Sequence, residues 1–360
     1  MSKHLLDLKN DNLYLFNLLF RHQVYLEGVK AGFARNYKKM LTDLYDEFAK
    51  YFGKTEYNSM DDFTRVELHR FIQRFLTAQD SFYSTYTQQL IELLKAFIAV
   101  DVDVSNAIYV AATGKSTTER ADQPKPADNP PTLALYQTSG TEAGNDALWA
   151  TIADTIIPAN GLTIPEMLEQ FGNATKSKVS MLMSRAYANG DTMRDTMGMI
   201  VGTRSSNFKD GLFATFSNQN NALIATAIQH ASSILQAGIA SVHFNQYVWV
   251  AILDGKTTVI CRNRDGNIYV YGEGPLPPAH YFCRSKAVAL YVDGETFDTP
   301  NTFYDWLTTQ PDEVIADMLG QAIAAQIIAG DPKIKGISIT DSVSPLTLSA
   351  FRSKINLITL

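Results

Sequence analysis

The sequence predicts an α+β protein in which a predominantly helical N-terminal region precedes a small C-terminal α+β domain built around a β-hairpin motif. Apolar residues recur at helical spacing through most of residues 4–100. After His243 the pattern changes to short β-branched and aromatic runs separated by Asp-Gly turns. With 46% hydrophobic residues the chain can bury real cores, so wholesale disorder is excluded.

These patterns divide the chain into four regions. Residues 1–112 form a helical N-terminal region, and residues 113–135 a Pro-rich linker or loop. A second helical region covers residues 136–240. Residues 241–360 form the α+β domain, which ends in further helices.

Three apolar stripes predict helices in the first hundred residues. The first runs from Leu13 to Val29 and the second from Met40 to Phe52. Gly53 then stands where a helix C-cap is expected. The third stripe follows Ser59, which is followed by two aspartates and is therefore predicted to be an N-cap. Long helices in series suggest a bundle or an extended stalk.

Further helices and the strands follow from the same patterns. Helical spacing returns from about Ile164, through 179–188 and 223–240, and again in the tail at 303–307 and 314–328. Short strands are expected at four places, which are 248–253, 257–260, 268–271 and 288–292. Asp-Gly pairs follow the first and precede the third of these runs, so both pairs are predicted to be turns.

The charge balance does not favour nucleic-acid binding. The net charge is −6 and the pI is near 5.5, whereas proteins that grip phosphate backbones usually carry a basic excess. Arg35–Lys39 and Arg262–Arg264 are basic clusters near aromatic residues, but both are short and more typical of solvated faces.

The chain is expected to be a soluble protein made in a cytosol, with no membrane contact. Its N-terminus has no apolar segment followed by a cleavage site, and no run of about 18 apolar residues is present to span a membrane. Two cysteines are too few for a disulfide-stapled secreted scaffold.

No catalytic motif stands out, so we expect no enzyme and no catalytic residues. Gly114-Lys115-Ser116 follows a strand-like run, but Tyr109 occupies the position of the first P-loop glycine. Gly272-Glu-Gly274 lacks a third glycine and a following helix, so it is no dinucleotide fingerprint. The sequence also contains no His-Glu-x-x-His, Gly-x-Ser-x-Gly or EF-hand pattern.

Both cysteines lie in the segment from Trp249 to Ser285. Cys261, His280 and Cys283 could bind zinc, with Asp254 as a fourth ligand, and the metal would then fix a loop with little core of its own. A packed, metal-free hairpin is the favoured alternative, so no cofactor is expected and zinc is the second possibility. A disulfide between the two cysteines is disfavoured in a reducing cytosol.

The order of residues in this segment is more specific than its cysteines. It contains an aromatic strand, Asp-x-x-Thr, a cysteine, Asp-Gly, a Pro-Pro-x-His turn and Cys-Arg-Ser. These elements are Trp249, Asp254, Thr257, Cys261, Asp265, Gly266, Pro277, Pro278, His280, Cys283, Arg284 and Ser285. Together they resemble the motif of the phage Mu F-like head morphogenesis, or minor head protein, family.

Flanking segments extend the resemblance to podophage-type minor capsid proteins of that family. They are Arg21–Leu26, Gly190–Met193, Ala225–Ser233, Tyr304–Pro311, Leu319-Gly320 and Pro345–Leu348. The resemblance therefore covers both ends and the C-terminal half, and it is weakest for residues 50–160.

The resemblance implies a structural minor virion protein of a tailed phage. Such a protein would associate with the portal or the head interior, as several copies around a ring, and act in head morphogenesis, genome packaging or ejection. Its partners would be the portal protein and other head proteins, with packaged DNA as a further candidate. It would be assembled in the host cytoplasm and reside in the capsid near the portal vertex. Separately from the resemblance, the planar guanidinium of Arg284 could brace the α+β domain by bonding several loop carbonyls, and a surface arginine is an equally weighted alternative.

Two other functions stay open. The C-terminal domain could share its fold with ADP-ribosyltransferases, but the chain contains no Glu-x-Glu carboxylate pair for that chemistry, and a shared fold does not establish a shared activity. The chain could instead be an internal DNA-binding ejection protein that acts through its short basic clusters.

Overall fold

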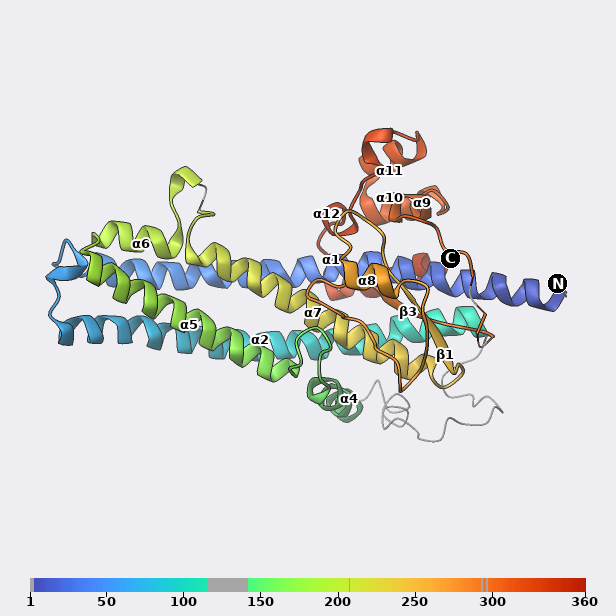
Figure 1. Cartoon of the computed structure of the whole chain (residues 1–360), viewed down its shortest axis with the longest axis horizontal. Coiled ribbons are helices and arrows are strands. Elements are labelled where there is room, and N and C mark those ends of the chain that lie inside the picture. The colour runs from blue at the N-terminus through green and yellow to red at the C-terminus, as the bar shows by residue number, and fades with distance from the viewer. Residues whose placement is uncertain (1–2, 115–141, 207, 293, 296) are drawn as a thin grey trace. The chain divides into compact units, whose positions relative to one another are not determined.

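The computed structural model describes residues 3–114, 142–206, 208–292, 294–295 and 297–360. In this part of the chain, long helices precede one small antiparallel sheet and short C-terminal helices, which confirms the predicted fold class (Figure 1). The helices are α1 (Lys3–Gly53), α2 (Arg65–Thr113), α4 (Glu142–Asp154), α5 (Ile164–Asn189), α6 (Met193–Val201), α7 (Leu212–Ala240), α8 (Val259–Arg264), α9 (Phe303–Leu307), α10 (Asp312–Leu319), α11 (Gln321–Ile328), α12 (Ile339–Ser342), α13 (Leu348–Arg352) and α14 (Ile355–Ile358). The 3-10 turns are η1 (Met60–Asp62), η2 (Arg204–Ser206) and η3 (Pro332–Ile334), and the strands are β1 (Gln246–Val250), β2 (Ile268–Val270) and β3 (Lys286–Ala289).

The structure groups into two compact units that are not consecutive lengths of chain. Unit 1 contains residues 1–32, 94–163 and 225–360, and unit 2 contains residues 33–93 and 164–224. This grouping differs from the four consecutive regions expected from the sequence. The physical reason is that α1, α2 and α7 are continuous helices that contribute residues to both units. The expected Pro-rich linker at 113–135 lies almost entirely outside the described residues.

The helix boundaries in the first hundred residues follow the sequence with one correction. As predicted, α1 ends at Gly53. Ser59, however, caps the 3-10 turn η1 rather than α2. Thr64 caps α2 instead, because its N–H donates to Glu67 Oε2 at 2.9 Å while its Oγ1 accepts the Glu67 N–H at 3.3 Å.

Unit 2 has an aromatic core. The Phe48 and Phe75 ring centroids are 4.5 Å apart in an edge-on arrangement, and Tyr37 packs 4.7 Å from Tyr86. The buried Tyr86 hydroxyl donates to Asn220 Oδ1 at 2.5 Å. Each of these side chains projects from one of the long helices, so the apolar stripes of the sequence are the core of this unit.

Unit 1 contains the sheet, with strand order β2-β1-β3 and antiparallel pairing throughout. The central strand pairs Tyr247 with Tyr269 on one side and Val248 with Val288 on the other. Because β1 is flanked on both sides, four of its five residues are buried. Three of the four predicted strands therefore exist, and each of their ends lies within three residues of its expected limit.

The remaining predicted strand, at 257–260, is wrong. Val259 and Ile260 instead begin α8, with Thr258 as its N-cap. The chain turns at Asp254, where the Asp254 N–H donates to Thr257 Oγ1 at 3.0 Å and the Thr257 hydroxyl donates back to the Ile252 carbonyl. These side-chain bonds redirect the backbone and override the strand preference of β-branched residues.

By length and composition alone, helix α7 is long and apolar enough to cross a membrane. No such segment was expected from the sequence, so the structure corrects that expectation. However, 83% of its most apolar stretch is buried inside the structure, as in the core helix of a soluble protein.

Candidate functional site

The segment that carried the sequence signal packs around Trp249 in unit 1. Trp249 lies on β1, is fully buried, and forms one apolar cluster with Ala251, Cys261 and Cys283. The Arg264 guanidinium lies over its ring, 5.0 Å from the centroid. The two cysteines, 22 residues apart in sequence, are therefore neighbours in the core beneath the sheet.

The Asp254 carboxylate is the centre of a buried ion pair. Arg284 donates two hydrogen bonds to it, at 2.5 and 2.8 Å, and the side chains are only 6% (Arg284) and 1% (Asp254) exposed. Burial by itself raises the pKa of Asp254, but the hydrogen bonds and charge of Arg284 outweigh it, so the pKa lies below its usual value. Arg284 is therefore buried and not a surface arginine, and the partners found for it are this carboxylate and, at 3.4 Å, the Thr340 hydroxyl, where loop carbonyls were expected from the sequence.

Asp265 and Gly266 close the connection from α8 to β2. Asp265 Oδ1 accepts the Ala251 N–H at 2.7 Å, and burial raises the pKa of this carboxyl. Gly266 has φ 77°, a conformation that a side chain disfavours, and it donates to the Trp249 carbonyl at 2.9 Å. Gly266 is therefore hydrogen-bonded to β1, and Asp265 is hydrogen-bonded to Ala251, the residue that follows β1.

The chain then reaches His280 and Cys283 through a tight turn. Pro277-Pro278 is joined by a cis peptide bond, and the Cys283 N–H donates to the His280 carbonyl at 3.1 Å. Phe282, between them, has φ 60°, in the left-handed region that L-residues seldom adopt. The turn places two potential metal ligands beside Cys261 of α8.

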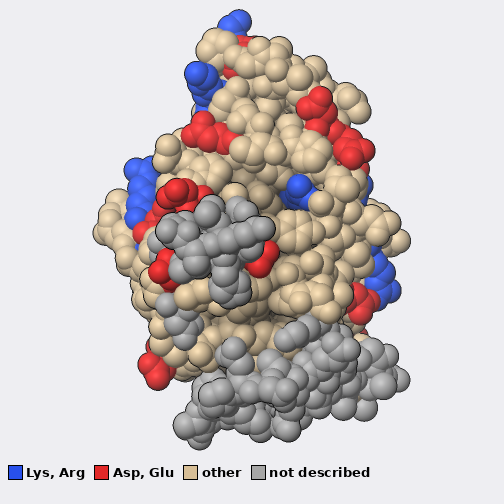
Figure 2. Space-filling model, turned by 90° about the vertical axis from the view of Figure 1, so that its right-hand side faces the viewer, with Lys and Arg blue, Asp and Glu red and all other residues tan. Residues whose placement is uncertain are grey.

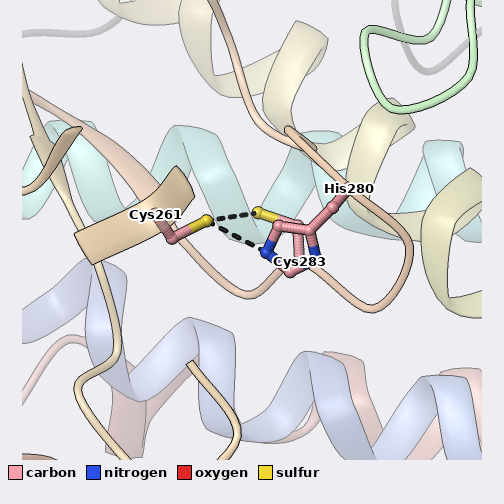
Figure 3. A group of neighbouring side chains, drawn as sticks. All are labelled: Cys261, His280 and Cys283. Atoms are coloured by element: carbon pink, nitrogen blue, oxygen red, sulfur yellow. Dashed lines mark hydrogen bonds between the residues drawn. The ribbon is translucent and has the colours of Figure 1, made fainter. Parts of the chain in front are cut away.

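Figure 3 shows the resulting cluster of Cys261, His280 and Cys283. Cys261 Sγ lies 3.1 Å from His280 Nε2 and 3.7 Å from Cys283 Sγ, and all three ligand atoms are within 4.8 Å of one another. Both cysteines are buried and free of disulfide bonding. Asp254, the fourth ligand expected from the sequence, is not part of this cluster, because both of its carboxylate oxygens are bonded to Arg284.

The two thiols differ in acidity. Burial raises the pKa of Cys283, but hydrogen bonds from Cys261, His280 and the Ala279 and Ser285 amides outweigh it, so the pKa falls well below its usual value. The pKa of Cys261 is raised, chiefly by its hydrogen bond to Cys283 and then by burial. The cluster therefore stabilises one thiolate, on Cys283.

A second group of polar residues in unit 1 was not predicted from the sequence. His22 of α1 lies between Asp101 of α2, at 2.6 Å from its Nε2, and Lys286 of β3, at 3.1 Å from its Nδ1. Lys286 also donates to Gln236 Oε1 at 3.1 Å. All four side chains are at most 3% exposed.

The group continues along α1. Lys30 donates to Glu27 at 2.6 Å and to Gln229 Oε1 at 2.8 Å, and Gln23 donates to both of these residues as well. Gln229 in turn donates to the Ser285 carbonyl at 3.3 Å. In the sequence, this group could have been suspected only from polar residues within otherwise apolar helical stripes, as in Arg21–Leu26 and Ala225–Ser233. Only the tertiary structure brings them together.

An open pocket of about 480 Å³ lies at the edge of the motif. Asp254, Arg262, Tyr304 and Lys335 are among the residues that line it. Both oxygens of the Asp254 carboxylate accept hydrogen bonds from Arg284. The pocket therefore offers no unpaired acid or base at Asp254.

Comparison with known proteins adds no relative. No protein-family model matches the chain, and neither a curated protein nor a solved structure is similar to it.

Proposed function

We propose that the chain is a structural minor virion protein of a tailed phage that associates with the portal or the head interior and acts in head morphogenesis, genome packaging or ejection. The basis is the resemblance of Trp249–Ser285 and its flanking segments to the Mu F-like minor head proteins.

The observation that carries the proposal is that four of the resembling segments bond to one another in unit 1. Arg21 Nε donates to Gln310 Oε1 at 2.8 Å, which joins the first resembling helix to the segment Tyr304–Pro311. Gln23 donates to Gln229 at 2.9 Å, and Gln229 reaches the Ser285 carbonyl. Short matches that arose by chance would have no reason to form one connected, buried network.

The chemistry of the motif also favours a structural role. Cys261 and His280 have the spacing of a thiol nucleophile and its base, but Cys261 is 2% exposed and Cys283 is fully buried. A buried sulfur cannot reach a substrate. The charged side chains of the motif, Asp254 and Arg284, are likewise buried and paired with each other.

On the face that Figure 2 shows, the distribution of charged side chains does not favour the DNA-binding alternative. There, Lys and Arg side chains are scattered in small groups with Asp and Glu nearby, among residues of other kinds. A protein that neutralises many phosphates needs a continuous basic stripe.

The test is co-expression of the full chain with the portal protein of its own phage, followed by purification through a tag on the portal. We expect the chain to elute with the portal ring, and mass spectrometry of purified virions to detect it in few copies. The portal of an unrelated phage is the control for non-specific capture. The proposal fails if the chain stays apart from its portal and is missing from virions. Sustained NAD hydrolysis by the purified chain would favour the enzyme alternative instead.

A further inference from the structure

We propose that Cys261, His280 and Cys283 bind one Zn²⁺ ion, with a water molecule as the fourth ligand. This inference concerns the chain's own stability and holds whether or not the chain binds a portal. The sequence alone favoured a metal-free hairpin, and the arrangement of the three ligand atoms changes that preference.

The distances fit a zinc tetrahedron. With Zn–S near 2.3 Å and Zn–N near 2.0–2.1 Å, tetrahedral angles place two sulfurs about 3.8 Å apart and a sulfur about 3.5 Å from a nitrogen. The Cys261–Cys283 sulfur separation is 3.7 Å, and Cys261 Sγ to His280 Nε2 is 3.1 Å, which a small movement of the ring would open. A disulfide would need about 2.05 Å between the sulfurs.

The imidazole is already oriented for metal binding. His280 Nδ1 lies 2.6 Å from the Tyr281 carbonyl, and this contact requires the proton on Nδ1. In the neutral imidazole, which is the form that binds a metal, Nε2 then carries the free lone pair, and Figure 3 shows this atom facing the sulfur of Cys261. Zinc-bound histidines usually donate their other ring N–H to a carbonyl or carboxylate in this way, which fixes the tautomer and the ring orientation.

The donor set selects the metal. Two sulfurs and one imidazole nitrogen are soft-to-intermediate ligands that suit zinc, whereas magnesium and calcium require oxygen ligands. Among the described residues, no fourth His, Cys, Asp or Glu joins the group. His280 is only partly buried, and a water molecule would enter the site from its side.

The ion would join two segments whose cysteines lie 22 residues apart in the sequence. Cys261 comes from α8, whereas His280 and Cys283 come from the turn before β3. Because the unfolded chain cannot hold the three ligands together, the binding free energy adds to the stability of the folded unit.

The experiment uses the reduced full chain expressed in zinc-supplemented medium. We expect elemental analysis to find about one zinc per chain. After exchange, Co²⁺ should give thiolate charge-transfer bands in the near ultraviolet and intense visible bands of a tetrahedral site. A chelator that removes the zinc should also lower the urea concentration at which the wild-type chain unfolds, because the ion stabilises only the folded unit.

Variants locate the site. Cys261→Ser and Cys283→Ser should each lose the bound zinc, and His280→Asn should weaken zinc binding at least about tenfold. His69→Asn, which changes an exposed histidine of α2, is the matched control and should bind zinc as the wild type does.

The proposal is overturned if the cysteine variants keep the zinc of the wild type. It is also overturned if the wild-type chain shows no cobalt–thiolate bands and unfolds at the same urea concentration with and without a chelator, and these two measurements need no variant to fold.

Discussion

Asp254 and Arg284 lie 30 residues apart in sequence and form a buried pair with two hydrogen bonds. Asp254 follows β1 and Arg284 precedes β3, so the pair ties together the two segments that adjoin these neighbouring strands. A buried charge is costly to leave alone, so each partner depends on the other.

The change Arg284→Met should destabilise the protein by about 3–5 kcal/mol, because it leaves the Asp254 carboxylate buried without a partner. Arg352→Met is the matched control, since Arg352 pairs with Asp103 on the surface, where both side chains are about half exposed. Its effect should be about 0–1 kcal/mol. Urea unfolding of both variants measures the difference, and equal losses would contradict a special role of the buried pair.

Replacing both members of the pair should be milder than replacing one. With Asp254→Leu added to Arg284→Met, no unpaired charge remains, and apolar groups of similar volume fill the space. We expect the double variant to recover roughly half or more of the free energy of unfolding that Arg284→Met loses. A double variant less stable than Arg284→Met would show that the turn around Asp254, rather than charge pairing, sets the loss.

Lys286 should make stability depend on pH. Burial lowers its pKa from 10.5 to about 7, and the nearby charges act in both directions, with Asp101 and Glu27 raising the pKa and Lys30 lowering it. Its neighbour His22 also has a lowered pKa, chiefly through burial and then through Lys286. Between the folded and unfolded pKa values of Lys286 the unfolded chain binds more protons, so this contribution to stability rises with pH in that window.

We expect Lys286→Met to flatten this rise. The slope removed is at most about 1.4 kcal/mol per pH unit between about pH 7 and pH 10, and it is measured from urea unfolding at several pH values. Lys256→Met, at a half-exposed lysine, should leave the slope of the wild type intact. Parallel pH profiles for wild type and Lys286→Met would refute the assignment.

Gly32 should not tolerate a side chain. A Cβ added there would lie 2.3 Å from the Leu346 carbonyl oxygen, whereas a Cβ at Gly53 meets nothing within 4 Å. Although alanine favours helix over glycine by about 1 kcal/mol, we expect Gly32→Ala to destabilise the protein by about 1–3 kcal/mol. Gly53→Ala should be neutral or slightly stabilising.

Hydrogen exchange adds a local measurement for the same variant. The Leu346 amide, which donates to the Gly28 carbonyl at 2.8 Å, should exchange faster in Gly32→Ala. Unchanged exchange and stability would mean that the segment around Leu346 can move aside at no cost.

Local patterns in the sequence predicted the long helices, most strands and the residues of the Cys-His cluster. Apolar periodicity is a local property, so the stripe from Met40 to Phe52 and the end of the helix at Gly53 could be predicted from neighbouring residues alone. Cys261, His280 and Cys283 were recognisable because their side chains are rare and chemically distinctive.

Only the tertiary structure decided how these residues are used. Asp254 was a plausible fourth ligand until the fold brought Arg284 to both of its oxygens. Val259 and Ile260 favour a strand by propensity, yet side-chain bonds at the preceding turn start a helix. Likewise, His22, Asp101 and Lys286 come from three distant segments. Pairing across such distances depends on the packing of the whole unit, which no local pattern in the sequence records.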